Sequence, residues 1–346
     1  MKIWIILSLV IGFLLAGGIY LEIKNKNRLL SFNDYFLERK DVMTKTEQVK
    51  LSNFGRAPAF TGLKEWFNSE ELKLQDLKGK VVLVDFWTYS CINCIRTLPH
   101  VTALYEKYKD QGLVIVGIHT PEFAFEKEPA NVAAALQRYN ITYPVALDND
   151  YATWQAYANR YWPAKYLVDQ SGKIVYTHFG EGQYQETEQA VRQLLGLTEE
   201  MADKPRLDLQ DRQVKTPEIY FGLNRLAYLF KEQQADASSK FYDLPDELPV
   251  NNFALGGQWS FNDESAVLQA IGGRIKITFF AKEIHMVAKS PKPNLIKIKI
   301  NGRPVNDVEV SDSRLYTLFS GDQAGENTLE MEISQPDFTI YTFTFG

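Results

Sequence analysis

The sequence is poor in cysteine and histidine, and it has no excess of positive charge. Its 346 residues include two cysteines and four histidines, and the formal net charge is −5 at pH 7. Two cysteines cannot form the network of disulfides that stabilises small secreted domains. An acidic chain also lacks the basic surface that binding to nucleic acid requires. The sequence therefore excludes a disulfide framework and predicts no nucleic-acid partner.

Both cysteines stand in one short stretch around which the chain is organised. Residues 81–84 are apolar and mostly β-branched, which is typical of a strand buried on both faces. The chain then turns at residues 88–90 and continues with a helical pattern, so Cys91 falls at or near the first turn of a helix. Unpaired N–H groups and the helix dipole favour an anion there, and hence the thiolate form of Cys91. Cys94 follows one turn later on the same face, where the two sulfurs can close a small disulfide ring.

The spacing of this cysteine pair favours redox chemistry over two alternatives. A structural disulfide is a poor interpretation, because the stabilisation from a disulfide falls as the loop that it closes becomes shorter. A zinc half-site is the second alternative. Zinc normally takes four ligands, or three and a water, but the sequence has no further cysteine and its histidines show no paired spacing. We therefore predict a redox-active disulfide between Cys91 and Cys94, with no cofactor and no metal.

One long uncharged run stands near the N-terminus. Residues 3–21 carry no charge and lie between Lys2 and a charged stretch that contains three basic residues. A run of this length can cross the hydrocarbon core as a helix. The small residues 16–18 would also suit a cleaved signal peptide, but the apolar run continues past them. We expect an uncleaved anchor at residues 1–22 and a spacer at residues 23–50.

The rest of the chain divides into two regions of different character. Residues 51–197 alternate between strand and helix patterns and end with a hairpin and a helix, which predicts an α/β domain. Residues 198–216 are charged and aperiodic, as expected of a linker. Residues 217–346 contain many short alternating segments separated by turns, a pattern typical of an all-β sandwich.

The motif Asp-Phe-Trp-x-x-x-Cys-x-x-Cys-x-x-x-x-Pro at residues 85–99 resembles the thioredoxin active site. The Pro-x-Phe at residues 58–60 and the Leu-Lys-Gly-Lys at residues 77–80 resemble the opening of the membrane-anchored TlpA/ResA-type thioredoxins. The resemblance implies a thioredoxin-like fold and a thiol-disulfide oxidoreductase that acts on protein disulfides in the reductive direction. In this chemistry Cys91 is the nucleophile and Cys94 resolves the mixed disulfide. The redox pair and the short N-terminal flank favour a periplasmic, extracytoplasmic location for both domains.

Two carboxylates are candidates for proton transfer to and from Cys94. Asp85 matches the buried carboxylate of thioredoxins, and a lone carboxylate on an apolar strand is costly enough to suggest a use. We expect it to accept the Cys94 proton. Glu122 follows the strand at residues 113–118 and aligns without a gap with an active-site glutamate of ResA-like reductases. The resemblance implies a second acid/base role there, and a surface loop charge is the alternative.

The resemblance also implies a docking groove for a polypeptide substrate. Pro163 precedes the predicted hairpin strand, at the position where the thioredoxin family has a cis proline. A cis peptide there would present the backbone of Trp162 to an extended substrate in a β-like contact. We expect Trp87, Trp162 and Pro163 to shape this groove.

The C-terminal region carries a second resemblance. Residues 216–222, 248–259 and 341–346 resemble the C-terminal module of DipZ-type proteins, which is similar to carbohydrate-binding jelly rolls. The combined resemblance covers roughly residues 50–346. It implies a cell-wall carbohydrate as a partner of the β-sandwich, and Trp259 fits the core of such a domain as well as a ligand platform. DipZ-type proteins also carry a multi-helix electron-transfer domain, so a single anchor implies a separate membrane electron donor of the CcdA/DsbD kind.

Two other functions fit parts of the same sequence. A peroxidase-like redoxin would reduce a peroxide at Cys91, although no Pro-x-x-x-Thr-x-x-Cys motif precedes this cysteine. A cell-wall glycan-binding protein would use the C-terminal domain as its main functional part, with redox activity secondary. Consumption of peroxide and capture of glycan by residues 217–346 would separate these alternatives from the oxidoreductase.

Overall fold

The computed structural model describes residues 49–197 and 214–346. The expected anchor at residues 1–22, nearly all of the spacer and most of the linker lie outside the described residues. Within the described ranges, no helix has the length and apolar character needed to cross a membrane.

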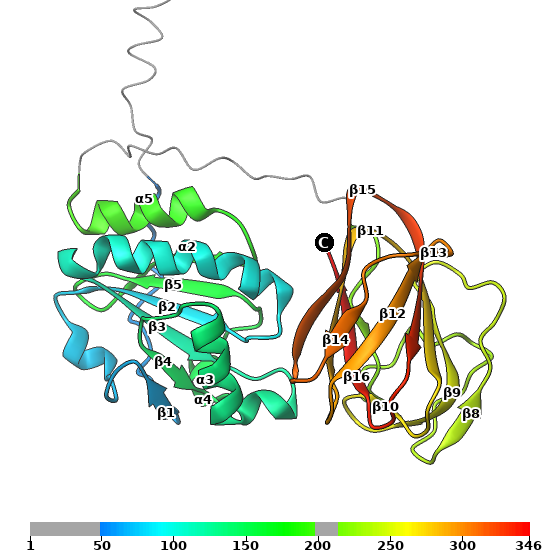
Figure 1. Cartoon of the computed structure of the whole chain (residues 1–346). Helices are drawn as coiled ribbons and strands as arrows, with labels where there is room; N and C mark the ends of the chain where they lie inside the picture. Colours follow the sequence, from blue (N-terminus) through cyan, green and yellow to red (C-terminus); the bar gives the residue numbers. More distant parts are fainter. Residues whose placement is uncertain (1–48, 198–213) are drawn as a thin grey trace, which may run out of the picture. The chain divides into compact units, whose positions relative to one another are not determined.

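The first described domain is built on a six-stranded mixed sheet (Figure 1). Its strand order is β1-β4-β3-β2-β5-β6. Strands β2, β3 and β4 run parallel, while β1, β5 and β6 pair antiparallel with their neighbours. The strands are β1 (Lys64–Phe67), β2 (Val81–Trp87), β3 (Leu113–His119), β4 (Val145–Leu147), β5 (Ala164–Val168) and β6 (Ile174–Phe179). Every residue of β2 is buried, as the apolar run predicted for a strand covered on both faces.

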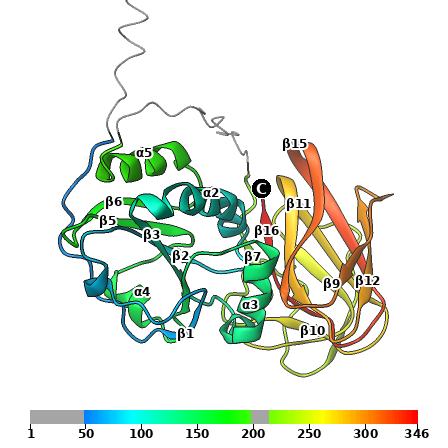
Figure 2. The same cartoon turned by 60° about the vertical axis from the view of Figure 1, so that its left-hand side comes forward.

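Four α-helices cover the two faces of this sheet. They are α2 (Ile92–Tyr108), α3 (Pro129–Arg138), α4 (Ala152–Ala156) and α5 (Tyr184–Leu194). Short 3-10 turns lie at Leu74–Leu77, Lys109–Gln111 and Ala124–Lys127. Figures 1 and 2 show α2 and α5 side by side over one face, with α3 and α4 on the other. The α/β order therefore agrees with the sequence. Helix α4 is short, and Ala158, two residues after its end, adopts a left-handed backbone with φ of 49°.

Residues 214–346 contain strands and no helix. The strands are β7 (Ile219–Tyr220), β8 (Lys240–Tyr242), β9 (Phe253–Phe261), β10 (Ala266–Leu268), β11 (Gly273–Lys289), β12 (Asn294–Ile300), β13 (Arg303–Pro304), β14 (Val308–Val310), β15 (Arg314–Ile333) and β16 (Thr339–Phe345). The long strand β11 pairs with β15 along most of its length. Its first half also pairs with β9 and its second half with β16. Strand β11 therefore connects β9, β15 and β16 in one sheet, and this sheet encloses one apolar core.

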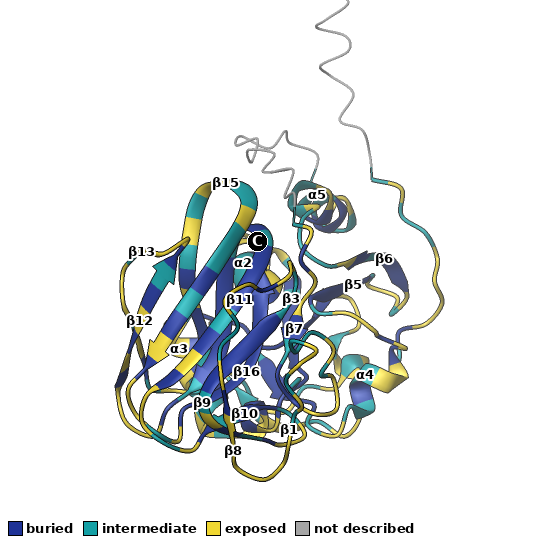
Figure 3. Ribbon diagram, turned by 90° about the vertical axis from the view of Figure 1, so that its right-hand side faces the viewer, coloured by how far each residue is buried: buried dark blue, intermediate teal, exposed yellow. Residues whose placement is uncertain are grey.

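The core of the β-rich domain explains its alternating sequence. Residues of β12 are buried and exposed in turn, and Figure 3 shows such banding along β12 and β15. Trp259 is fully buried in this core, and its ring N–H donates a hydrogen bond of 2.9 Å to the carbonyl of Gly256. Trp259 is therefore a core residue and not an exposed platform for a ligand.

Candidate active site

The two cysteines differ in their exposure to solvent. Cys91 is the N-cap residue of α2 and is partly exposed, whereas Cys94 lies in the first turn of the helix and is 1 % exposed. The Cys91 Sγ accepts a hydrogen bond of 3.3 Å from the backbone N–H of Cys94. This sulfur occupies the position where a helix stabilises an anion. The accessible thiol is therefore suited to attack a disulfide, and the buried thiol to resolve the product.

Cys94 needs a base in order to react. Burial raises the pKa of the Cys94 thiol well above its usual range, and contact with Cys91 raises it further. The negative charge of Asp85 acts in the same direction, which shows that the two groups are neighbours. Because the thiolate is the reacting form, Cys94 must lose its proton inside the protein.

Asp85 lies on β2 and forms an ion pair with a lysine that the sequence analysis did not single out. The Lys165 Nζ is 3.2 Å from the Asp85 Oδ1, and the side chains of Lys165 and Asp85 are 3 % and 1 % exposed. Burial raises the pKa of Asp85, and the charge of Lys165 opposes this rise. The two residues face each other in the register of β2 and β5. A lysine in an otherwise apolar strand pattern was the available signal for this pair.

Trp87 ends β2 and is completely buried. Its ring packs edge-on against the ring of His119, with 5.2 Å between centroids. Burial lowers the pKa of His119 to about 3, so its ring is neutral at physiological pH. With no exposed surface, Trp87 cannot contact a substrate directly, so its expected place in the docking groove is corrected to a place in the core.

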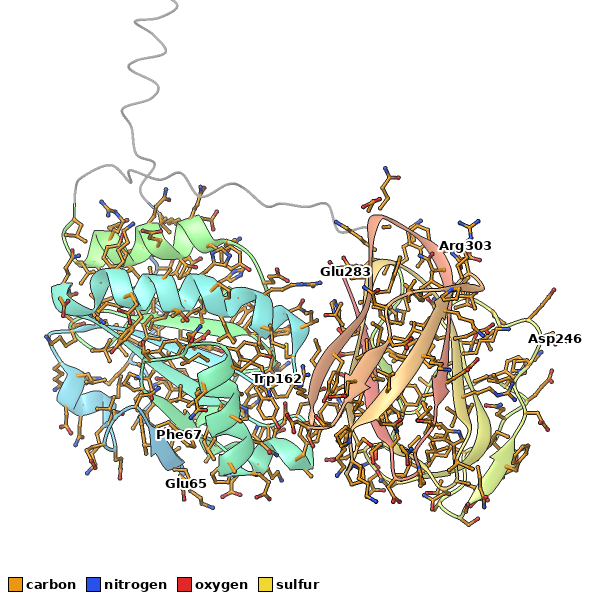
Figure 4. All side chains as sticks on the ribbon, viewed as in Figure 1. Glu65, Phe67, Trp162, Asp246, Glu283 and Arg303 are labelled. Atoms are coloured by element: carbon orange, nitrogen blue, oxygen red, sulfur yellow. The ribbon has the colours of Figure 1, made fainter. Side chains whose placement is uncertain are left out.

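The peptide bond between Trp162 and Pro163 is cis. Ala164 pairs with Phe86 on β2, so Pro163 lies beside the end of β2 that leads to the cysteines. The Trp162 side chain, labelled in Figure 4, donates a hydrogen bond of 3.1 Å from its ring N–H to the carbonyl of Thr120. Its ring packs against that of Trp154 at 4.3 Å between centroids, so two contacts fix its orientation.

Glu122 lies in the loop after β3, and its carboxylate contacts residues of the β-rich domain. Its Oε1 accepts hydrogen bonds of 2.8 Å from the hydroxyl of Tyr220 and 2.7 Å from the guanidinium of Arg225. The two domains belong to one compact unit of the chain. Further contacts join the Ala124 N–H to the Glu264 carboxylate at 3.0 Å, and the ring of Phe125 to that of Tyr341 at 4.7 Å.

The carboxylate that reaches the cysteine loop is Glu126, which the sequence analysis missed. Its side chain is 0 % exposed, and its Oε1 accepts a hydrogen bond of 2.6 Å from the hydroxyl of Ser90, the residue before Cys91. Burial raises the pKa of Glu126 to about 7, although bonds from Ser90 and Thr88 counteract part of the rise. Its place directly after two phenylalanines, Phe123 and Phe125, was the signal available in the sequence.

No group of three or more His, Cys, Asp or Glu side chains within residues 49–197 and 214–346 is arranged to hold a metal ion. The cysteine pair, the buried Asp85–Lys165 pair and the Glu126 carboxylate can instead move electrons and protons at sulfur.

Comparisons with known proteins agree with this chemistry. A family model described as AhpC/TSA family matches residues 55–177, and one described as thioredoxin like C-terminal domain matches residues 216–346. Thiol-disulfide oxidoreductase YkuV of Bacillus subtilis is 32% identical over 41% of this chain and 95% of YkuV. Thiol-disulfide oxidoreductase ResA of Halalkalibacterium halodurans is 32% identical over 38% of this chain and 70% of ResA.

The similarity to Protein DipZ of Mycobacterium tuberculosis extends over both domains. The two sequences are 39% identical over 306 residues, which is 86% of this chain and 44% of DipZ. The chain thus spans less than half the length of this relative. The resemblance inferred from the motifs is confirmed, as is the thioredoxin-like α/β domain followed by a β-rich region.

Proposed function

Because the chain belongs to the thiol-disulfide oxidoreductases of the thioredoxin family, we propose that it reduces protein disulfides through Cys91 and Cys94. The observation that carries the proposal is the asymmetry of the pair. The sulfur of Cys91 is partly exposed at the helix N-terminus, and the Cys94 thiol is buried one turn behind it. One thiol can therefore meet a substrate while the other is protected from side reactions.

The reaction proceeds in two exchange steps. The Cys91 thiolate attacks one sulfur of the substrate disulfide, and the other substrate sulfur leaves as a thiolate. Asp85 then accepts the Cys94 proton, and the Cys94 thiolate attacks Cys91 in the mixed disulfide. The second substrate sulfur leaves, the substrate gains two electrons, and the protein ends with a Cys91–Cys94 disulfide. Lys165 stays beside Asp85 throughout, and its charge favours the carboxylate form that takes the proton.

Extracytoplasmic placement and an electron donor complete the proposal. Residues 1–22 would anchor the chain in the inner membrane, with both domains on the periplasmic side, and a membrane reductase of the CcdA/DsbD kind would return the electrons. The uncharged run and the redox pair support this arrangement. Protease digestion of intact spheroplasts tests it, because the domains would be digested only if they lie outside the cytoplasmic membrane.

The β-rich domain would act as a jelly-roll module that binds cell-wall carbohydrate. The resemblance to DipZ-type C-terminal modules supports this role, and the burial of Trp259 means that any stacking contact uses another aromatic residue. A full-length chain that is not retained by any of a panel of cell-wall polymers would contradict the role and would leave the redox proposal untouched.

The reduction potential of the cysteine pair tests the proposed direction. The full-length protein is equilibrated with defined thiol buffers, and the fraction of disulfide is measured. A potential of about −270 mV or below indicates a reductase, whereas a potential near about −120 mV would make the protein an oxidant of its substrates. A Cys94→Ser variant should trap mixed disulfides with its substrates, and a Cys91→Ser variant should trap none.

A further inference from the structure

Glu126 joins two loops beside the cysteine pair. Its Oε1 accepts hydrogen bonds of 2.6 Å from the hydroxyl and 3.3 Å from the backbone N–H of Ser90, in the loop after β2. Its Oε2 accepts bonds of 2.5 Å and 3.0 Å from the backbone N–H groups of Glu122 and Phe123, in the loop after β3. One fully buried carboxylate thus connects the residue before the nucleophile to the neighbouring loop of the sheet.

A buried carboxylate is costly, so its hydrogen bonds must compensate for lost hydration. Three of its donors are backbone N–H groups, whose positions fix the path of the chain. Ser90 is held at both its backbone and its side chain, which leaves Cys91 little freedom at the start of α2. Glu126 therefore constrains the position of the Cys91 sulfur through Ser90, without contacting the sulfur itself.

We propose that Glu126 is a positioning residue for thiol-disulfide exchange. Its carboxylate holds Ser90 against the loop after β3 and so keeps the Cys91 sulfur at the N-cap position, from which it attacks the substrate disulfide. This inference rests on the proposed function. In the step concerned, a sulfur–sulfur bond forms between Cys91 and one substrate sulfur, the substrate disulfide breaks, and the electron pair leaves with the substrate sulfur that was not attacked. Glu126 takes up no proton and forms no covalent bond.

Substitution of Glu126 changes a charge as well as a set of hydrogen bonds, and the two effects must be separated. The titratable groups that face Glu126 are Glu122 on its own loop, Tyr89 on the loop after β2 and Tyr151 ahead of α4. His119 bonds to Thr88, a further partner of Glu126, and is neutral. The rate of the first exchange step must therefore be compared at a pH at which Cys91 is fully ionised. A difference in rate then reports the position of the Cys91 sulfur and not its charge.

The experiment follows the reaction of the fully reduced, full-length protein with 5,5′-dithiobis(2-nitrobenzoic acid) by stopped flow across a range of pH. The quantity compared is the limiting rate at high pH, together with the midpoint of urea unfolding for each variant. Glu126→Gln removes the charge with little change in shape, and Ser90→Ala removes the hydroxyl donor while Glu126 stays. Glu128→Gln is the matched control, because Glu128 is exposed and lies outside this contact.

We expect the limiting rate to fall about tenfold in Glu126→Gln and in Ser90→Ala, as for the loss of a hydrogen bond to a charged group. Glu128→Gln should match the wild type. Wild-type limiting rates in both variants would overturn the proposal, even if their unfolding midpoints fall, because Glu126 would then have only a structural role. If Glu126→Gln does not fold, the rate of Ser90→Ala decides. Equal rates for the wild type and Cys91→Ser would instead refute the proposed function itself.

Discussion

The ammonium group of Lys165 lies 3.2 Å from the carboxylate of Asp85, and both side chains are almost completely buried close to Cys94. The two residues come from neighbouring antiparallel strands, with Asp85 opposite Lys165 in the register of β2 and β5. Isolated charges at this depth would be neutralised or exposed, so each is retained because of the other. Beside Lys165, the Asp85 carboxylate can alternate between its ionised and protonated forms.

Removal of the lysine should destabilise the fold in a pH-dependent way. We expect Lys165→Met to lower the free energy of unfolding by about 3 to 5 kcal/mol at pH 8, because an unpaired carboxylate then remains in the interior. The loss should be smaller at pH 5. Burial already raises the pKa of Asp85, and without Lys165 the carboxyl group takes up a proton more readily. Urea unfolding at both pH values measures the difference, and an equal loss at both would contradict this account of the pair.

Substitution of Asp85 should slow the resolution of the mixed disulfide by Cys94 and leave the attack of Cys91 on the substrate unchanged. Asp85→Asn removes the carboxylate that accepts the Cys94 proton, and general base catalysis typically contributes a factor of about 100 or more. We expect the mixed disulfide with a small thiol to persist about a hundredfold longer than in the wild type. Rapid quench and mass measurement of the intact protein follow this species. A resolution rate unchanged from the wild type would remove Asp85 from the mechanism.

The local parts of the site could be predicted from the sequence. An apolar strand, a turn and a helix follow one another within residues 81–99, and the cysteine spacing and Asp85 are readable within this single stretch. The position of Cys91 at the start of the helix follows from the same local pattern. Contacts between residues close in sequence depend mainly on short-range periodicity, and this explains why they could be found.

The other charged groups depend on contacts between distant segments. Lys165 meets Asp85 only because of the register between β2 and β5. Glu126 reaches Ser90 because a 3-10 turn at residues 124–127 brings it back toward the loop after β2. An ungapped comparison with related proteins favoured Glu122, four residues earlier, and no local pattern distinguishes the two glutamates. Sequence alone could therefore indicate an acidic residue in this loop without identifying the one that contacts the cysteine loop.

Ionisation of Glu126 should change the free energy of unfolding as well as the rate of the first exchange step. The pKa of Glu126 is raised to about 7 in the folded protein from the ordinary value of 4.5. A raised carboxyl pKa favours the protonated folded state, so this group's contribution to stability is present below pH 4.5 and is lost as the pH rises toward 7. We expect the difference in unfolding free energy between the wild type and Glu126→Gln to shift in favour of the variant between pH 5 and pH 8. Parallel profiles for the two proteins would contradict the raised pKa.

Close packing behind the cysteine pair makes Gly117 sensitive to substitution. A Cβ atom added at Gly117 would lie 3.0 Å from a methyl carbon of Val145 and 3.1 Å from both the ring nitrogen of Trp87 and a ring carbon of Tyr143. Overpacking of this kind typically costs about 1 to 3 kcal/mol. We expect Gly117→Ala to lower the free energy of unfolding by that amount. Gly325→Ala is the control, because its added Cβ would meet no atom within 4 Å, and an equal loss in both variants would point to a general effect of alanine.

Glu122 offers a direct test of whether a loop carboxylate acts in the chemistry or in the contact between domains. Its partners are Tyr220 and Arg225, and the Arg225 side chain is 40% exposed. A double-mutant cycle with Glu122→Gln and Arg225→Gln should therefore give a coupling energy of only about 1 kcal/mol, since solvent screens the pair.

If that contact is the main role of Glu122, the single substitution reduces stability while the rate of mixed-disulfide resolution stays within about twofold of the wild type. A tenfold slower resolution in Glu122→Gln, with stability unchanged, would instead assign Glu122 the acid/base role that its alignment with ResA-like reductases implied. The comparison is decisive because Glu126→Gln, four residues away, is expected to slow the first exchange step and not the second.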